Sequence, residues 1–151
     1  MTKLVTQEGY KKLKDELEHR KTTVRQEIAQ AIKEAKEQGD LSENAEYSEA
    51  KRQQTENETR VAQLEVMIKE AQIVEHDEAS DTIEIGSSVD VEFGGNKMTF
   101  HIVGSNEADP GENKISNESP IGKAFMGKKK GDSVNVEVPS GIVKYSILDV
   151  K

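Results

Sequence analysis

The fold is decided by residues 39–47, which read GDLSENAEY. Gly39 suits the positive-φ residue that ends a helix. Asp40 and Glu43 stand three residues apart, the spacing of a capping box that begins the next helix. One helix therefore ends where another starts, and only a very short turn separates them. The two helices are expected to fold back on each other as an antiparallel pair.

Apolar residues recur at steps of three and four on both sides of this turn, which is typical of one buried face per helix. The upstream stripe consists of Tyr10, Leu13, Leu17, Val24, Ile28 and Ala35, and the downstream stripe of Tyr47, Ala50, Val61, Leu64, Ile68 and Ala71. Residues 51–60 contain no apolar side chain, so the middle of the seam is expected to be weak. Thr6 is the predicted N-cap of the first helix. Each helix has about 32 residues, which corresponds to a rod of roughly 45 to 50 Å.

The composition changes near residues 77–82, since all three prolines and nine of the 11 glycines follow this point. Residues 89–93 and 133–138 alternate strictly between apolar and polar, and residues 142–150 are rich in β-branched side chains, as in strands. A short helix is predicted over residues 121–126, with Ser119 as its cap and Pro120 in its first turn. The fold class is therefore α+β, with a helical hairpin followed by an antiparallel sheet and one short helix.

Composition excludes several classes of protein. No cysteine is present, so neither a disulfide framework nor a thiolate metal site is possible. The N-terminus does not resemble a secretory signal, and the longest apolar runs are far shorter than the roughly 20 residues that cross a bilayer. These features predict a cytoplasmic protein without a membrane segment. The formal charge is −8, so free nucleic acid is not the expected primary partner.

Acidic side chains gather at the predicted hairpin end. Asp40, Glu43 and Glu46 follow one another at steps of three and offer carboxylate oxygens to a hard cation such as Mg²⁺. These groups cannot complete an octahedral site, so another molecule would have to supply the remaining ligands. The simpler interpretation is that Asp40 and Glu43 only cap a helix, and their position alone does not decide between the two. Four basic residues flank the predicted tip: Lys33, Lys36, Lys51 and Arg52. Their position alone does not decide whether they contact phosphates or form a solvated face.

A family resemblance adds to this interpretation. Residues 39–47, followed by Ala50-Lys51 and Gln53-Gln54, closely resemble the hairpin-tip signature of the GreA/GreB transcript cleavage factors of bacteria. Further similar positions lie downstream, at Ile115-Ser116, Ser119 to Ala124, Gly127-Lys128, Gly131-Asp132, Pro139 to Gly141 and Tyr145. The resemblance spans the whole chain.

The resemblance implies a domain organisation and a partner. Residues 1–76 would form a coiled-coil hairpin with its acidic tip at 39–46, and residues 80–151 a C-terminal domain of FKBP-like topology. The C-terminal domain would dock on bacterial RNA polymerase, with Ser119 and Pro120 in the polymerase-facing loop. The hairpin would enter the secondary channel and reach the 3′ end of backtracked RNA.

The family resemblance also implies roles for individual residues at the hairpin tip. Asp40 and Glu43 match the two acidic residues of the family that help to hold a second, loosely bound Mg²⁺ in the polymerase active site and position the attacking water. Lys36 and Lys51 match basic positions near the RNA 3′ end, and Arg52 is a further candidate contact. The chain would thus activate the polymerase rather than act as an enzyme, and it would bind no small-molecule substrate.

Three alternatives compete with this hypothesis. An inhibitory relative would occupy the same channel without promoting cleavage, but the intact acidic pattern from Asp40 to Glu43 argues against it. A structural coiled-coil adaptor would not require an acidic tip. Prolyl isomerase activity is suggested only by the implied topology, and the C-terminal segment has few aromatic residues with which to line a proline pocket. The acidic balance favours GreA-like behaviour, with short cleavage products, over GreB-like behaviour.

Overall fold

A computed structural model describes residues 2–40, 43–77 and 79–151. Leu41 and Ser42, which belong to the predicted tip and its cap, lie outside the described residues, as do Met1 and Glu78. The chain divides into two compact units. One unit spans residues 11–70, and the other combines the described parts of residues 1–10 and 71–151.

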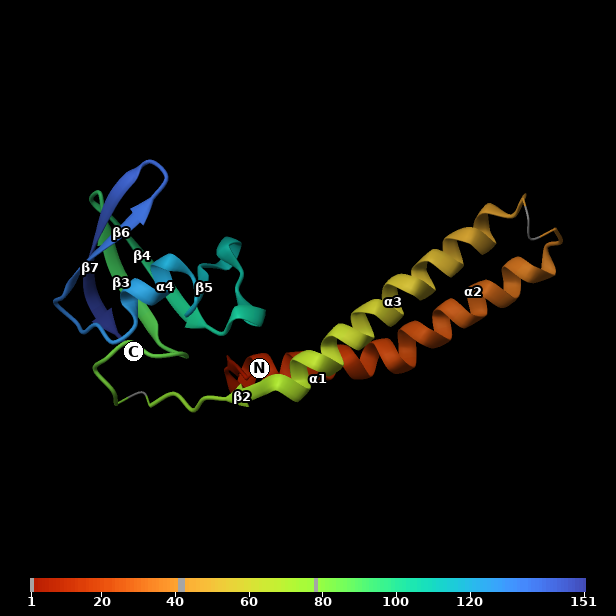
Figure 1. Cartoon of the computed structure of the whole chain (residues 1–151), viewed down its shortest axis with the longest axis horizontal. Helices are drawn as coiled ribbons and strands as arrows, with labels where there is room; N and C mark the ends of the chain where they lie inside the picture. The colour runs from red at the N-terminus through yellow and green to blue at the C-terminus, as the bar shows by residue number, and fades with distance from the viewer. Residues whose placement is uncertain (1, 41–42, 78) are drawn as a thin grey trace. The chain divides into compact units, whose positions relative to one another are not determined.

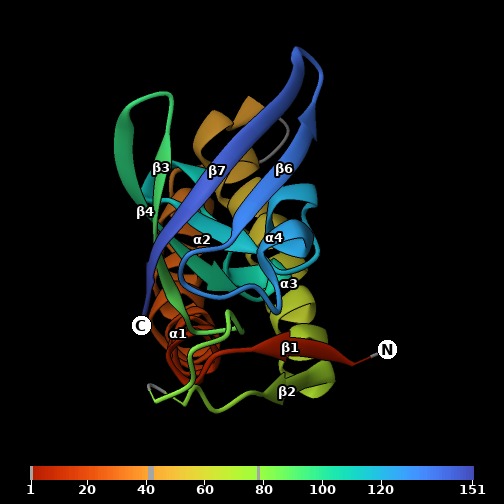
Figure 2. The same cartoon turned by 90° about the vertical axis from the view of Figure 1, so that its left-hand side faces the viewer.

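The first unit is an antiparallel helical hairpin, as predicted. Its first arm contains α1 (Gln7–His19), the π-helical segment η1 (Arg20–Val24) and α2 (Arg25–Glu37), and its second arm is α3 (Ala45–Glu70). Figures 1 and 2 show α2 and α3 side by side. Six apolar residues of the seam are buried among those that the structure describes: Leu13, Ile28, Ala35, Ala50, Val61 and Leu64. No helix in the described part of the chain is long and apolar enough to span a bilayer.

The first arm departs from the predicted uninterrupted α-helix at η1. There the Arg25 N–H donates to the Arg20 carbonyl five residues earlier, as in a π-helix. The same carbonyl accepts a second hydrogen bond of 3.1 Å from Nδ2 of Asn57 on α3. Arg20 returns a bond of 3.2 Å from its guanidinium to Oδ1 of Asn57, whose side chain is only 3% exposed. A buried amide satisfied in this way fits only one alignment of the two arms.

Ion pairs also cross the stretch that lacks apolar residues. Both oxygens of the Glu16 carboxylate accept from Arg60, at 2.9 and 3.0 Å, and Arg20 adds a bond of 2.7 Å. Glu58 forms a similar two-bond pair with Arg25, at 2.7 and 2.9 Å. Bonds from Arg60, supported by Arg20, lower the pKa of Glu16 from its ordinary 4.5 to about 2. Polar contacts therefore connect the arms where apolar contacts are missing.

The second unit contains a five-stranded sheet in the order β5-β4-β3-β7-β6. Its strands are β3 (Ser88–Phe93), β4 (Asn96–Val103), β5 (Lys114–Ser116), β6 (Ser133–Val138) and β7 (Gly141–Val150). Neighbouring strands are antiparallel except β4 and β5, which are parallel because η3 (Ser105–Glu107) and η4 (Pro110–Glu112) carry the chain back between them. The α+β class is confirmed, but the sheet is mixed rather than entirely antiparallel.

One helix, α4 (Pro120–Phe125), packs against β5 and β6 (Figure 2). The core of this unit is built from two residues that precede β3, from alternate strand residues and from one helix residue: Ile83, Ile85, Val89, Val91, Phe100, Ile102, Phe125, Val134, Val136, Tyr145 and Ile147. Tyr145 meets Phe125 and Phe100 edge to face within this core. The turn between β3 and β4 uses Gly94 and Gly95, both with positive φ, as tight two-residue hairpin turns require.

The N-terminal segment belongs to the sheet unit. Strand β1 (Lys3–Val5) pairs in parallel with β2 (Ala71–Ile73), and neither strand was predicted. Thr6 caps α1 as predicted, because its hydroxyl accepts a bond of 3.0 Å from the Gly9 N–H. The same hydroxyl donates to Glu107, whose carboxylate also accepts from the Thr6 N–H at 3.0 Å. These bonds explain why the contacts group the first ten residues with the sheet, whereas the predicted division assigned residues 1–76 to the hairpin.

Replacing Asn57 tests its role between the arms. Asn57→Ala leaves the Arg20 guanidinium and carbonyl without this buried partner, so the free energy of unfolding should fall by roughly 1–3 kcal/mol. Urea unfolding followed by circular dichroism measures the change. Thr59→Ala, at an exposed position of the same helix, should stay within about 0.5 kcal/mol of the unaltered chain. Equal stability of both variants would show that the amide contributes nothing.

Glu16 should make the stability of the hairpin depend on pH. Its pKa is lower in the folded chain than the ordinary 4.5, so its contribution is fully present above about pH 5 and is lost as the pH falls toward the folded value. Glu16→Gln should flatten the stability profile between about pH 5 and pH 2, whereas Glu27→Gln, exposed on α2, should leave the slope intact. Unfolding temperatures across this range distinguish the two variants, and identical slopes would contradict the assignment.

Candidate functional site

The end of the hairpin is organised by Asn44. Its Oδ1 accepts a hydrogen bond of 3.0 Å from the Tyr47 N–H, which makes Asn44 the N-cap of α3. Its Nδ2 donates a bond of 2.7 Å to the Ala35 carbonyl in the last turn of α2. The second helix therefore begins at Ala45 and not at Asp40. The sequence analysis missed this role, although asparagine is among the best N-cap residues and could have signalled it.

The three acidic residues lie at this end of the hairpin, and all are exposed. Asp40 and Glu43 precede the first residue of α3, whereas Glu46 lies in its first turn. Only Glu46 is therefore part of the second helix. Gly39 has φ of +118°, which confirms the expected positive φ after α2. Among the described residues, no donor contacts the Glu43 carboxylate.

The donor chemistry of this end fits a contribution to a magnesium site rather than a whole one. Exposed carboxylate oxygens are ligands that Mg²⁺ accepts. Within the described ranges, however, no three acidic or histidine side chains converge closely enough to hold a metal ion. Asp40 and Glu43 could therefore supply some of the ligands, and a partner would have to provide the others.

The basic residues near this end differ in the side chains that already bind them. Lys36 is exposed, and no carboxylate in the described part of the chain pairs with it. Lys51 donates to the Gln54 side chain at 2.9 Å. The guanidinium of Arg52 is bound by two carboxylates, Glu49 and Glu56, and this pairing lowers the pKa of Glu49 to about 2. Arg52 would have to leave both partners before it could contact a phosphate.

In the sheet unit, Ser119 and Pro120 begin α4 as predicted. The Ser119 hydroxyl accepts from the Gly122 N–H at 3.0 Å and donates to the Ser116 carbonyl at 2.7 Å. A Cβ added at Gly122 would lie 1.9 Å from that carbonyl oxygen, so only glycine allows the helix to pack this closely. Pro120 fills the first helical position and is exposed. The loop is thus held by its own hydrogen bonds.

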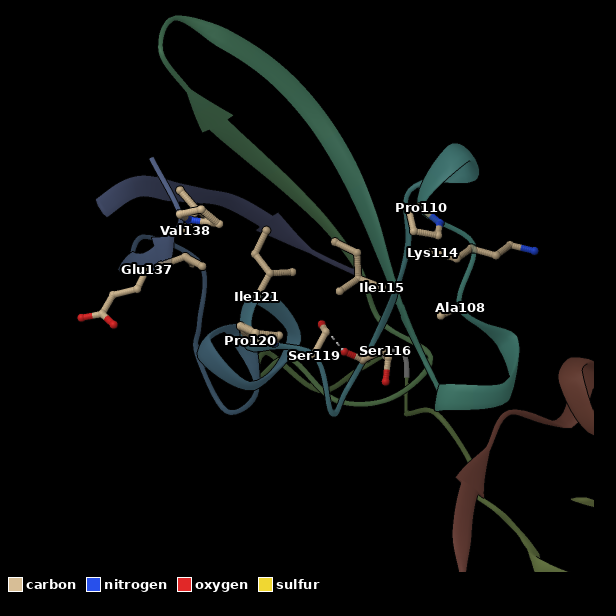
Figure 3. Close-up of a pocket in the computed structure, with 12 residues that line it drawn as sticks. Ala108, Pro110, Lys114, Ile115, Ser116, Ser119, Pro120, Ile121, Glu137 and Val138 are labelled. Carbon is tan, nitrogen blue, oxygen red and sulfur yellow. Dashed lines mark hydrogen bonds between the residues drawn. The ribbon is translucent and has the colours of Figure 1, made fainter. Parts of the chain in front are cut away.

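A pocket of about 410 Å³ opens beside this loop. Figure 3 shows the side chains of Ile115, Ile121 and Val138 around it, while the charged ends of Lys114 and Glu137 point away. None of the 12 residues that line it is aromatic, and the full set is Ala108, Pro110, Lys114, Ile115, Ser116, Ser119, Pro120, Ile121, Val136, Glu137, Val138 and Pro139. The cavity can take apolar side chains of a partner, but it lacks the aromatic wall of a proline-binding site.

Comparison with known proteins assigns the chain to a family. Residues 3–73 match the family described as "Transcription elongation factor, N-terminal", and residues 77–151 match "Transcription elongation factor, GreA/GreB, C-term". The chain belongs to the GreA/GreB family of transcription elongation factors. The two matched regions meet between residues 73 and 77, just after β2.

Relatives of this family resemble the chain over nearly its full length. The transcription elongation factor GreA of Clostridium novyi is 53% identical over 98% of the chain and 95% of its own length. GreA of Thermoanaerobacter pseudethanolicus is 51% identical over 98% and 96%. Among solved structures, GreA factor homolog 1 of Thermus thermophilus is 27% identical, covers 100% of this chain and 99% of its own, and has a TM-score of 0.46. The family matches and the two GreA relatives confirm the resemblance seen in the sequence.

Proposed function

We propose that this chain binds bacterial RNA polymerase through its secondary channel and stimulates cleavage of the 3′ end of backtracked RNA. The observation that carries the proposal is that Asp40 and Glu43 are exposed at the end of the hairpin, where Asn44 performs the capping. An acidic residue that caps a helix would be explained by its structural role alone. Since Asn44 takes the cap, the acidity of Glu43 calls for another explanation.

The role of the two carboxylates follows from their incomplete ligand set. Asp40 and Glu43 would hold part of the coordination sphere of a Mg²⁺ ion whose other ligands come from the polymerase. Bound there, Mg²⁺ supplies charge stabilisation for the leaving oxygen and makes a water molecule a better nucleophile. The chain itself orients oxygens and adds negative charge, so hydrolysis takes place in the polymerase and the chain acts as its activator.

The hairpin suits delivery of these groups. The 26 residues of α3 correspond to roughly 39 Å of helix, and the arms are narrow because alanines occupy the seam nearest the tip, at Ala35 and Ala50. Lys36 and Lys51 would approach the RNA backbone beside the carboxylates, and Arg52 would do so after exchanging its carboxylate partners. The names of the two GreA relatives favour the GreA-like form of this activity, with short cleavage products.

Docking would use the other unit. Ser119 and Pro120 border an apolar pocket, and an exposed proline beside apolar side chains offers a contact area to a partner surface. Polymerase binding would therefore depend mainly on the sheet unit, and RNA cleavage on the tip. This division makes the two functions separable by mutation.

Removing one charge at the tip tests the first role. Glu43→Gln and Asp40→Asn should each lower stimulated cleavage in stalled, backtracked complexes by roughly 100-fold, because an amide is a poorer ligand for Mg²⁺ than a carboxylate. The assay follows shortening of labelled RNA at saturating factor. Glu37→Gln, an exposed acid near the end of α2, is the matched control. Full activity of both tip variants would disprove the metal role.

Truncating the docking loop tests the second role. Pro120→Ala should raise the factor concentration needed for half-maximal cleavage by about tenfold, which corresponds to roughly 1.4 kcal/mol of binding, while the maximal rate stays the same. Asn135→Ala, exposed on β6, should not change either quantity. A lower maximal rate with unchanged half-saturation would place Pro120 in the cleavage step instead.

A further inference from the structure

A single side chain connects the two helices at the end of the hairpin. The Asn44 Nδ2 to Ala35 carbonyl bond, at 2.7 Å, joins the start of α3 to the last turn of α2. The Ala35 carbonyl also accepts a hydrogen bond of 3.2 Å from the Gln38 N–H. It therefore takes part both in the last turn of α2 and in the bond to Asn44. Ala35 is only 1% exposed, which places this bond at the inner side of the tip.

This bond closes a loop that contains both acidic residues. Along the sequence, residues 36–43 separate the two bonded positions; Lys36 and Glu37 end α2, and Asp40 and Glu43 follow them. Two carboxylates in one short loop repel each other, and exposure to solvent weakens that repulsion without removing it. Without the bond, the ends of the loop could separate, and the carboxylates would occupy a wider range of positions.

We propose that Asn44 is a positioning residue for the cleavage reaction. Its amide group would hold the loop so that Asp40 and Glu43 meet the same metal ion, without touching metal or RNA itself. This inference rests on the proposed function, because positioning matters only if the carboxylates act. It assigns a separate purpose to each half of the amide: Oδ1 caps α3, and Nδ2 ties the two arms together.

Two substitutions separate these purposes. Asn44→Ala removes both the cap and the tie, whereas Asn44→Ser keeps a good N-cap and removes only the tie. If the tie positions the carboxylates, Asn44→Ser should restore most of the stability lost in Asn44→Ala but not the cleavage rate. The maximal rate should fall roughly ten- to a hundredfold in both variants, because small misplacements of catalytic groups have effects of this size. The half-saturating factor concentration should not change.

A distance measurement gives a readout that does not depend on cleavage. The chain has no cysteine, so spin labels can be attached at Glu37→Cys and Ser48→Cys, both exposed and on opposite arms. Electron paramagnetic resonance on the full chain should show a broader distribution of distances when Asn44 is Ser or Ala. Val61→Ala, which truncates a buried seam residue away from the tip, is the matched control and should leave the distribution narrow.

The outcomes are distinct. Wild-type cleavage by Asn44→Ser, or an unchanged distance distribution, would overturn the positioning role and leave Asn44 as a cap. Reduced cleavage by Asn44→Ser together with a broadened distribution supports it. Glu43→Gln, measured in the same assay, checks the proposed function itself: if that variant cleaves normally, the proposed function fails, and the distance distribution still decides whether Asn44 holds the loop.

Discussion

The hairpin depends on keeping two long helices in one register with few apolar side chains. Three polar connections provide this register where residues 51–60 offer no hydrophobic contact: Asn57 with Arg20, Glu16 with Arg60, and Glu58 with Arg25. Exposed ion pairs contribute little stability individually. A buried amide is more selective, because a shift of the helices would leave Asn57 and the π-helical carbonyl of Arg20 without partners. The register in turn determines which residues meet at the tip.

The tip is likewise held by hydrogen bonds, with few buried apolar side chains. Asn44 caps α3 and bonds to the last turn of α2, while Asp40 and Glu43, outside both helices, remain exposed to solvent. A cleavage factor needs this combination, since ligands for a metal ion in another protein must be accessible and yet held in place. The tip is therefore stabilised by Asn44, whereas the proposed metal ligands are Asp40 and Glu43.

Local features were predictable where one residue type meets one backbone requirement. Thr6 and Ser119 were identified as N-caps, and Gly39 as a positive-φ residue, because each satisfies a condition set within a few residues of the chain. Three strands of the second unit were predicted: β3 and β6 from their alternation, and β7 from its β-branched residues. The π-helical segment, the pairing of β1 with β2 and the bond from Thr6 to Glu107 were not predicted, since each depends on a partner far away in the sequence.

The α+β class, the helical hairpin, the acidic character of its tip and, through the resemblance now confirmed, the family could all be inferred from the order of the residues. These properties are carried by periodicity and by contiguous motifs, which require no knowledge of long-range contacts. The folded structure was needed to show that Asn44 caps α3, that Asn57 is buried against Arg20 and that Arg52 is paired with two carboxylates, whereas no carboxylate among the described residues pairs with Lys36. The physical reason is that one polar side chain has several possible partners, and only the folded backbone brings one of them within hydrogen-bonding distance.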